Sequence, residues 1–446
     1  MFAKKSKITF DYIIIGSGFA GSILAKLLNN SCIIERSTGS PTYKKNILPK
    51  NNSYVNSISK DYHPRFSNVI GGNSTFWNNR LGVLSKKEFS QMKILMKYSE
   101  FIYYTKKTLK LLGLQKHYNK LISKNNIEKE KIHLRTKIFN IFDYLKIYKR
   151  KKTKILTGFS PIKFEKHNNN KKIDSIIISN LKEEKRIYFK KAVILCAGPF
   201  GNVYLIKNLL KKSIISGRYL CDKPQINFCN LSYKLAKKFN KIKVSFLKKN
   251  SDYEISFIQK KKNYFMGTHL TVDTNCYTKN ASLFKKLHKF FIGITNKFLH
   301  KIKLKSFYYF YFYFSSRRNK FNNVHLSNSK DLFGLNKINI NYKIDIKDFL
   351  IYKMHIEKFL KEKISITLKD FKKKIILGNH PSSCNSMGTH SNNSTVDKNL
   401  KIHKYSNIYV LGSDVLKLPG ITNPALIIMT LAYRLADELK KKYKKL

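Results

Sequence analysis

The sequence predicts an α/β protein whose first domain is built on a Rossmann-like sheet, and three observations support this prediction. Residues 10–36 have the pattern of a strand, a glycine turn, a helix and a second strand. Residues 191–210 contain another apolar strand that leads through small residues into a helix. Between them, residues 155–186 show short alternating runs that are typical of strands. Since 446 residues can bury more than one core, a second domain is expected.

The first stretch has the features of a dinucleotide-binding site. An apolar run, Tyr12–Ile15, precedes Gly16, Gly18 and Gly21, which have the G-x-G-x-x-G spacing. In this motif the first glycine permits a tight turn, the second lets a pyrophosphate approach the backbone, and the third lets the helix pack closely on the strand. An ordinary glycine-rich turn is the alternative interpretation.

The residues on either side of this turn strengthen the prediction. Phe19 and Ala20 begin the helix, and free N–H groups at a helix start face phosphates. Glu35 ends the second strand at the spacing at which an acidic side chain accepts hydrogen bonds from a ribose. Arg36 follows it, and all four residues are candidates for cofactor binding.

The high positive charge of the chain suggests a protein that binds nucleic acids or acidic lipids, but the choice of basic residues argues against this interpretation. The formal net charge is +62, and strongly basic surfaces attract nucleic acids and acidic lipids. Only ten of the 88 basic residues are Arg, whose planar side chain pairs bidentately with phosphate. The lysines are spread through every segment beside abundant Asn, Ile, Tyr and Phe, which share AT-rich codons. Compositional drift therefore explains the charge, and no nucleic-acid partner is expected.

The cysteines and the apolar segments suggest a cytoplasmic protein. The six cysteines include no C-x-x-C pair and do not cluster with His, so reduced thiols and no metal site are expected. No signal peptide precedes the first strand, and no apolar stretch approaches the length of a membrane span. Residues 283–304 form a candidate basic amphipathic helix that could lie on an anionic membrane surface, although packing on its own domain is the commoner use.

A second glycine-containing segment introduces a family resemblance. Gly71 and Gly72 permit a bend before Asn73, Ser74 and Thr75, and the only tryptophan, Trp77, follows. This segment resembles the part of the glucose-methanol-choline (GMC) flavin oxidoreductases that lies against the flavin, most closely in the pyranose oxidase and sugar dehydrogenase branch. The resemblance implies FAD as cofactor and Gly72, Asn73, Ser74, Thr75 and Trp77 as its contacts. Some members of that branch bond FAD covalently to a His that is Phe76 here, so non-covalent FAD is expected.

Two further segments extend the resemblance. Ala197 and Gly198, in the turn after the strand 193–196, resemble the GMC segment that covers the adenosine half of the flavin. GRYLCDKP, residues 217–224, resembles the family's Gly-Arg-x-Leu-x-Asp-His signature, with Lys223 in place of the His. The aromatic run 307–314 is interpreted as a core strand of an antiparallel sheet, with a substrate platform as the alternative. Residues 322–341 resemble the family's strand-turn-strand, which implies a place in the roof of the substrate cavity.

The strongest resemblance lies in residues 378–439. The family's C-terminal features occur there in order and with matching spacing, at His380, Met387, Val396, Asp397, Gly412, Ser413, Asn423 and Pro424. By this resemblance His380 is the base that takes the hydroxyl proton, a role that suits the near-neutral pKa of histidine. Asn423 would hold the substrate oxygen. Asp414 would contact the ribityl chain, and Pro424 would lie near the flavin pyrimidine. The sequence departs from the family at 382–385, just after His380.

The resemblance implies an FAD-dependent oxidoreductase that oxidises the CH–OH group of a small-molecule alcohol, plausibly a sugar or polyol. It predicts a discontinuous FAD domain (1–85, 150–225 and 375–446), a helical insertion (86–149) and an α+β substrate domain with an antiparallel sheet (226–374). Neither the substrate nor the electron acceptor follows from the sequence. Three alternatives stay open: an enzyme of sugar or surface-polysaccharide biosynthesis, a catalytically degenerate FAD-binding protein, and a basic binder of nucleic acid or membranes.

Overall fold

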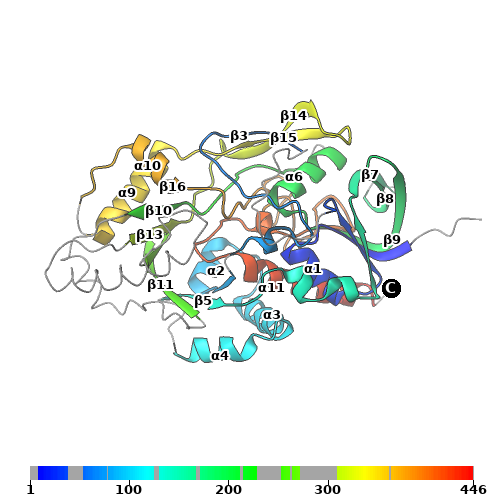
Figure 1. The fold of residues 1–446 in the computed structure, drawn as a ribbon, viewed down its shortest axis with the longest axis horizontal. Helices are drawn as coiled ribbons and strands as arrows, with labels where there is room; N and C mark the ends of the chain where they lie inside the picture. Colours follow the sequence, from blue (N-terminus) through cyan, green and yellow to red (C-terminus); the bar gives the residue numbers. More distant parts are fainter. Residues whose placement is uncertain are drawn as a thin grey trace, which may run out of the picture.

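The computed structural model describes residues 9–38, 54–77, 79–124, 130–166, 171–210, 214–228, 253–261, 264–271, 309–360 and 363–444. Figure 1 shows two parts side by side. One is a sheet covered by helices α1, α6 and α11, and the other is an antiparallel sheet beside helices α9 and α10 (Leu368–Lys374). The predicted α/β fold class is confirmed.

A parallel sheet forms the centre of the first part, with strand order β6-β2-β1-β9-β17. Ile13 and Ile14 in β1 and Val193 and Ile194 in β9 have no exposed surface, as expected for strands that are covered on both faces. Both strands predicted from the sequence are therefore confirmed. Their bounds are β1 (Thr9–Ile15), β2 (Ser31–Glu35), β6 (Thr153–Thr157), β9 (Glu184–Leu195) and β17 (Ile408–Val410).

The two halves of strand β9 pair with different strands. Its first half pairs antiparallel with β8 (Ile173–Ser179), which pairs in turn with β7 (Ser160–Lys166). Its second half continues into the parallel sheet between β1 and β17. The alternating pattern of residues 155–186 therefore belongs partly to the parallel strand β6 and partly to this antiparallel meander.

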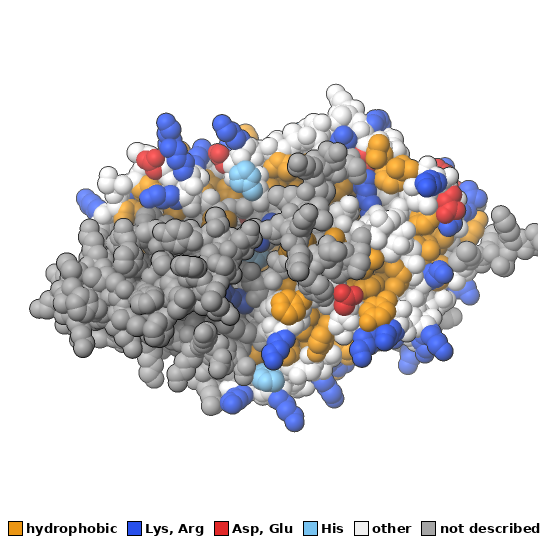
Figure 2. All heavy atoms as spheres, in the orientation of Figure 1, with side chains coloured by type: hydrophobic (Ala, Val, Ile, Leu, Met, Phe, Trp, Pro, Cys, Tyr) orange, Lys and Arg blue, Asp and Glu red, His pale blue; other side chains and the backbone are white. Residues whose placement is uncertain are grey.

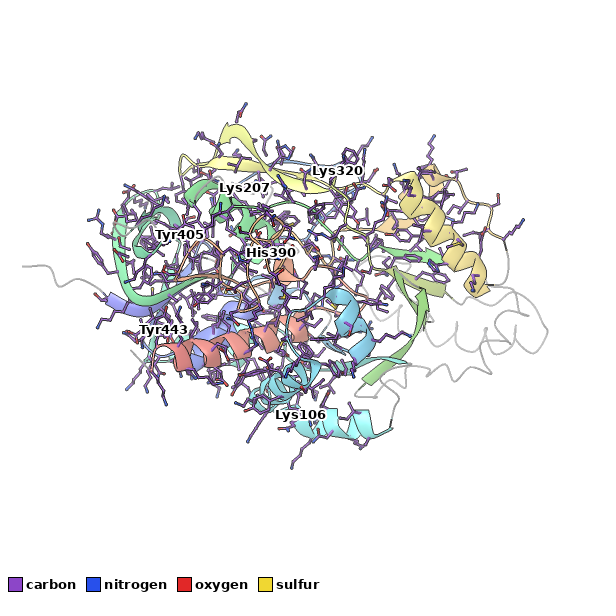
Figure 3. The ribbon with its side chains drawn as sticks, turned by 180° about the vertical axis from the view of Figure 1, so that it is seen from behind. Lys106, Lys207, Lys320, His390, Tyr405 and Tyr443 are labelled. Atoms are coloured by element: carbon purple, nitrogen blue, oxygen red, sulfur yellow. The ribbon has the colours of Figure 1, made fainter. Side chains whose placement is uncertain are left out.

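Three helices cover the parallel sheet and position the loops at its carboxyl edge. They are α1 (Phe19–Leu27), α6 (Gly198–Leu209) and α11 (Ala425–Lys442). Helix α11 packs between α1 and α3 (Tyr98–Leu111). Just beyond its end, the Tyr443 hydroxyl donates to the Lys191 carbonyl (2.7 Å) and ties the C-terminal helix to the sheet. Figure 3 labels Tyr443 at this end of the helix.

The second part is built on a seven-stranded antiparallel sheet. In β13, Phe312 and Phe314 are buried, and the Phe314 ring stacks on Tyr352 of α9 (Ile346–Leu360) with 4.3 Å between centroids. The interpretation of 307–314 as a core strand is confirmed for these residues. In sheet order the strands are β16 (Ile375–Ile376), β10 (Gln225–Phe228), β13 (Tyr309–Phe314), β12 (Tyr264–Thr271), β11 (Tyr253–Lys261), β5 (Glu130–Arg135) and β4 (Arg80–Val83).

The strand-turn-strand predicted at 322–341 is present in a sheet of its own, and its place in the roof of a substrate cavity stays a prediction. Strands β14 (Asn323–Lys330) and β15 (Asn336–Asn341) form a separate sheet with β3 (Val55–Ile58). They pack against α6 on the side of the parallel sheet (Figure 1). Strand β15 pairs in parallel with β3, and it is therefore not an extra strand of the antiparallel sheet.

The described residues of the region predicted as a helical insertion form four α-helices and one strand of the antiparallel sheet. The helices are α2 (Lys86–Met92), α3, α4 (Gln115–Lys124) and α5 (Ile141–Tyr144), and the strand is β5. Strand β4 also lies in the antiparallel sheet, although its residues fall within the predicted segment 1–85. The division into domains stays a prediction.

The surface shows the high charge of the chain. In Figure 2 Lys and Arg side chains are scattered around the visible face of the described residues and do not gather on one element. Within the described part of the chain, no helix is both long and apolar enough to span a membrane. The amphipathic segment 283–304 lies outside the described residues.

Candidate active site

The glycine turn after β1 uses its three glycines in three different ways. Gly16 has φ +102°, and a Cβ there would overlap the Cys196 carbonyl on the neighbouring strand. A Cβ on Gly21 would overlap the carbonyl oxygen of Gly16, so this glycine lets α1 lie against the turn. At Gly18 the nearest atom to a Cβ would be the Gly71 oxygen at 3.9 Å. The backbone is therefore open at the one position where a pyrophosphate has to approach.

Glu35 closes the turn from the end of β2. One carboxylate oxygen accepts from the Ser17 amide (3.0 Å) and the Ser17 hydroxyl (2.6 Å), and the other accepts from the Ser37 amide (3.1 Å). Burial raises the pKa of Glu35, and these hydrogen bonds oppose the rise. The Ser17 amide and hydroxyl use both lone pairs of the first oxygen, so a ribose hydroxyl would be accepted at the second oxygen.

Arg36, the next residue, is surrounded by aromatic rings. Its guanidinium carbon lies 4.8 Å from the Phe333 ring centroid and 5.4 Å from that of Tyr54. The guanidinium also lies 3.5 Å from Asp331, which accepts a hydrogen bond from Tyr204. These contacts hold the side chain at the rim of the predicted adenosine end of the site.

The segment 71–77 lies directly against the glycine turn. The Gly71 amide donates to Ser17 Oγ (2.8 Å), and a Cβ on Gly72 would lie 3.4 Å from the Gly18 Cα. Residues Gly72–Thr75 form a short 3₁₀ helix, in which Ser74 Oγ donates to the Gly71 carbonyl (2.7 Å) and Thr75 Oγ1 to the Gly72 carbonyl (2.9 Å).

The other two residues of this segment differ in exposure. Asn73 is exposed and donates to the Arg65 carbonyl (3.2 Å). Trp77 packs edge-on against Phe19 with 5.1 Å between centroids. Among the described residues nothing accepts from its buried Nε1. A buried donor of this kind calls for an acceptor.

The turn after β9 forms a further side of the site. Gly198 has φ +76° and nothing within 4 Å of where its Cβ would be. The Ala197 amide donates to Asn202 Oδ1 (2.9 Å), and Asn202 Nδ2 donates to the Asp414 carboxylate (3.0 Å). Asp414 also accepts from Asn385 Nδ2 (2.7 Å). Its buried carboxylate therefore joins three loops inside the protein, and a contact with a ribityl chain stays a prediction.

The residues present fit a bound FAD. The open backbone at Gly18 and Gly198 leaves room for the cofactor, and Trp77 Nε1 is a buried donor without a partner among the described residues. The predicted contacts Phe19, Glu35, Thr75 and Pro424 are half-buried.

A loop held by a buried acid carries His380. The Asp222 carboxylate accepts from the His380 amide (2.8 Å) and from the Gly378 amide. Burial raises the pKa of Asp222, and the backbone N–H groups counteract this. Ser413 Oγ donates to the Pro381 carbonyl (2.6 Å) and fixes the other side of the loop. Of residues 377–388, only Asn379 and His380 are not fully buried.

A second buried acid holds the turn that carries Asn423. Glu88 on α2 accepts from the Ile421 amide (2.7 Å), the Thr422 amide (2.8 Å) and the Thr422 hydroxyl (2.7 Å). Asn423 Oδ1 accepts from Lys223 Nζ at 2.6 Å. Of residues 419–432, only Asn423 and Pro424 are not fully buried. Each of these two loops therefore presents its predicted catalytic side chain toward accessible space.

Sequence reasoning missed Glu88 and the roles of Asp222 and Lys223. Glu88 follows Ser85 by three residues, which is the spacing of a capping box, and its amide does donate to Ser85 Oγ (3.2 Å). Its carboxylate nevertheless binds a turn more than 300 positions away. Asp222 and Lys223 stood inside a noted motif, but local pattern does not show which loops they hold.

Replacing Glu88 tests how firmly the Asn423 turn is held. Glu88→Ala leaves three buried donors without their acceptor, and each costs about 1–3 kcal/mol. We expect the free energy of unfolding of the apoprotein, measured with urea, to fall by about 3 kcal/mol. Glu88→Gln, which keeps one acceptor oxygen and the side-chain volume, should lose less. A loss below about 1 kcal/mol in Glu88→Ala would contradict this account.

Asp414 predicts a pH dependence of stability. Burial raises its pKa from 3.8 to about 6, so the folded protein binds a proton between these values that the unfolded chain does not. The contribution of Asp414 to the free energy of unfolding therefore increases as the pH falls through 6, and it is lost as the pH rises again. Between pH 7 and pH 5 the wild type should gain about 1 kcal/mol relative to Asp414→Asn in urea unfolding. An equal pH response in both proteins would contradict a raised pKa of Asp414 in the folded protein.

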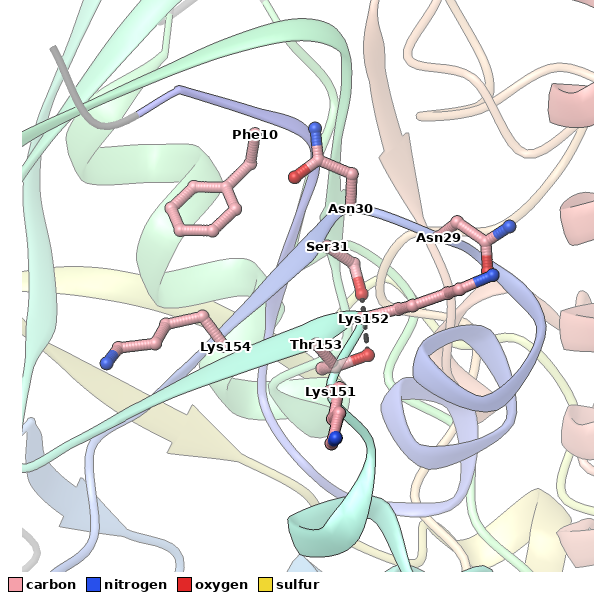
Figure 4. Close-up of a pocket in the computed structure, with 8 residues that line it drawn as sticks. All are labelled: Phe10, Asn29, Asn30, Ser31, Lys151, Lys152, Thr153 and Lys154. Carbon is pink, nitrogen blue, oxygen red and sulfur yellow. Dashed lines mark hydrogen bonds between the residues drawn. The ribbon is translucent and has the colours of Figure 1, made fainter.

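One groove among the described residues lies away from this site. It has a volume of about 480 Å³ and lies at the amino ends of β1, β2 and β6 (Figure 4). The glycine turn follows the carboxyl end of β1, at the opposite edge of the sheet. The groove has a Ser31–Thr153 hydroxyl contact of 3.1 Å and a lysine-rich rim at 151, 152 and 154. In the described part of the chain no cluster of His, Cys, Asp or Glu could hold a metal ion.

Comparisons with known proteins agree with this geometry. Residues 318–432 match the family model of the GMC oxidoreductases, C-terminal domain. This match agrees with the predicted resemblance to the GMC oxidoreductases over these residues. No curated protein sequence matches the chain significantly.

Solved structures share the fold over nearly the whole chain. Pyridoxine 4-oxidase from Mesorbium loti superposes with a TM-score of 0.60 at 12% identity, covering 96% of this chain and 99% of the other. A formate oxidase variant of Aspergillus oryzae RIB40 gives 0.58 at 12% identity, covering 99% and 100%. The nearness to the pyranose oxidase branch stays a prediction.

Proposed function

We propose that this protein oxidises the CH–OH group of a small sugar or polyol by hydride transfer to non-covalently bound FAD. The observation that carries the proposal is that His380 and Asn423 are half-buried in two loops whose other residues are mostly buried, and that each loop is held by a buried carboxylate. Polar side chains of this kind suit a reaction that moves a proton and stabilises an oxygen.

The proposed residues divide the reaction between them. His380 takes the proton of the substrate hydroxyl, and its neutral imidazole is the form that accepts it. The Asn423 amide donates to the same oxygen as negative charge develops there. When bound, FAD supplies the acceptor for the hydride that leaves the carbon. The product is a carbonyl compound, so two electrons and two protons are accounted for once the flavin is reduced.

Residues at the cofactor side have binding roles in this proposal. Main-chain N–H groups at Gly18, Phe19 and Ala20 face the phosphates, and Glu35 accepts from the ribose. Phe76 stands where a covalent attachment would need a histidine, so acid precipitation should release the flavin. Retention of yellow colour in the pellet would contradict this part of the proposal.

An anaerobic substrate screen tests the proposed function. FAD-loaded protein is mixed with aldoses, polyols and simple alcohols, and with nucleotide-linked sugars as a separate arm. Bleaching of the flavin by one of these compounds supports the proposal, and the arm in which it occurs separates a free-sugar enzyme from a biosynthetic one. Stoichiometric FAD that no alcohol reduces would favour a protein that binds FAD without catalysis.

A further inference from the structure

We propose that the dipeptide Asp222–Lys223 is a clamp that positions both members of the proposed catalytic pair, and that Lys223 makes Asn423 a charge-assisted donor to the substrate oxygen. This inference rests on the proposed function and adds two positioning residues to it. It starts from a lysine that is only 3% exposed and stands where the resembling motif has a His.

The contacts of Lys223 define the orientation of Asn423. Lys223 Nζ lies 2.6 Å from Asn423 Oδ1 and 3.3 Å from the Ile421 carbonyl, with the Tyr313 ring centroid 5.2 Å away. An ammonium group can only donate, so the amide atom that faces it is the oxygen. Asn423 Nδ2 therefore points away from Lys223, and among the described residues no hydrogen bond from it is present.

This orientation has a chemical consequence. A hydrogen bond from a cation to an amide oxygen polarises the amide and strengthens the donor at the nitrogen, because hydrogen bonds in a chain reinforce one another at low dielectric. Asn423 Nδ2 is then a better donor to an oxygen that gains negative charge than to a neutral hydroxyl. The contribution is greater in the transition state than in the ground state, so it acts on kcat.

Asp222, which precedes Lys223, connects the Lys223–Asn423 contact to the proposed base, His380. Asp222 accepts from the His380 amide, and also from the Lys223 amide (2.8 Å). Asp222 is fully buried, and its amide is fixed by Ser316 Oγ (2.9 Å). Two adjacent residues therefore hold two loops that are 43 positions apart in sequence, and a displacement of one loop is passed to the other.

Kinetics of Lys223→Met in the FAD-loaded enzyme test the role of the charge, with the alcohol found in the screen as substrate. We expect kcat to fall about ten- to a hundredfold with KM within about threefold of the wild type. Lys223→Gln, which keeps an uncharged donor, should be intermediate. Lys207→Met is the matched control, because Lys207 is a half-buried lysine on α6 outside the site (Figure 3). A kcat within about twofold of the wild type in Lys223→Met would overturn the proposal.

A double-mutant cycle separates positioning from a general structural role. Because Lys223 acts through Asn423, its removal should cost less than about twofold in the Asn423→Ala background. A structural lysine would cost the same in both backgrounds, and that result would overturn the proposal. Retained flavin colour shows that each variant folds.

Acetate binding gives a readout that does not need turnover. Calorimetric titration of the FAD-loaded protein with acetate should show at least about tenfold weaker binding in Lys223→Met than in the wild type, with Lys207→Met unchanged. Equal acetate affinity in all three proteins would overturn the proposal that Asp222 and Lys223 form a clamp. If no alcohol reduces the flavin while this difference is seen, the proposed function fails and the inference about Lys223 stands.

Discussion

His380→Ala is expected to lower the rate of flavin reduction by about 10²- to 10⁴-fold while FAD stays bound. The imidazole is the proposed acceptor of the hydroxyl proton, and without it the hydride would have to leave a protonated alcohol. The Asp222 contacts run to main-chain amides, so the loop should keep its shape in the variant. Rapid mixing of substrate with FAD-loaded protein without oxygen measures this rate directly.

A control from the same part of the chain makes the result specific. His390 is an exposed histidine ten positions further on, labelled in Figure 3, and His390→Ala should reduce the flavin within about twofold of the wild type. If His380→Ala retained full activity, His380 would not be the base, and the case for a catalytically degenerate protein would strengthen.

Gly18→Ala is expected to abolish tight FAD binding without unfolding the protein, whereas Gly21→Ala should destabilise the fold itself. The backbone at Gly18 has φ −66°, which alanine adopts readily, and the nearest atom to the new methyl would be 3.9 Å away. The methyl group would therefore occupy only the space that the pyrophosphate needs. At Gly21 it would overlap the Gly16 carbonyl, and relief of such an overlap costs about 1–3 kcal/mol.

Two measurements distinguish these outcomes. Titration with FAD should show at least about a tenfold loss of affinity in Gly18→Ala, with urea unfolding of the apoprotein unchanged within about 1 kcal/mol. Gly21→Ala should unfold at lower urea concentration even without cofactor. Normal FAD affinity in Gly18→Ala would show that the phosphates do not lie at this turn.

Local sequence predicted the elements that depend on neighbouring residues. The run before Gly16 and the glycine spacing predicted β1, the turn and α1, because turn geometry and strand burial are set by adjacent side chains. The apolar run at 193–195 likewise predicted the end of β9. The family block at the C-terminus singled out His380 and Asn423 by the order of its motifs, and both are half-buried among buried neighbours.

Distant pairings did not follow from sequence patterns. The partner of β15 is β3, nearly 300 positions earlier, and alternation along a strand does not specify a partner. Glu88 stands among charged residues that resemble a solvated helix start, yet its carboxylate is buried on the Asn423 turn. Lys223 departs from the family motif, and only its contact with Asn423 in the structure indicates the role proposed for it.

The most direct test of the central claim compares flavin reduction by an alcohol with its reduction by the same alcohol deuterated at the reacting carbon. Hydride transfer in the site of His380 and Asn423 predicts that the alcohol bleaches the flavin, and that deuterium slows the bleaching several-fold because the C–H bond breaks in that step. FAD that is bound but not reduced by any alcohol, sugar or polyol would contradict the claim.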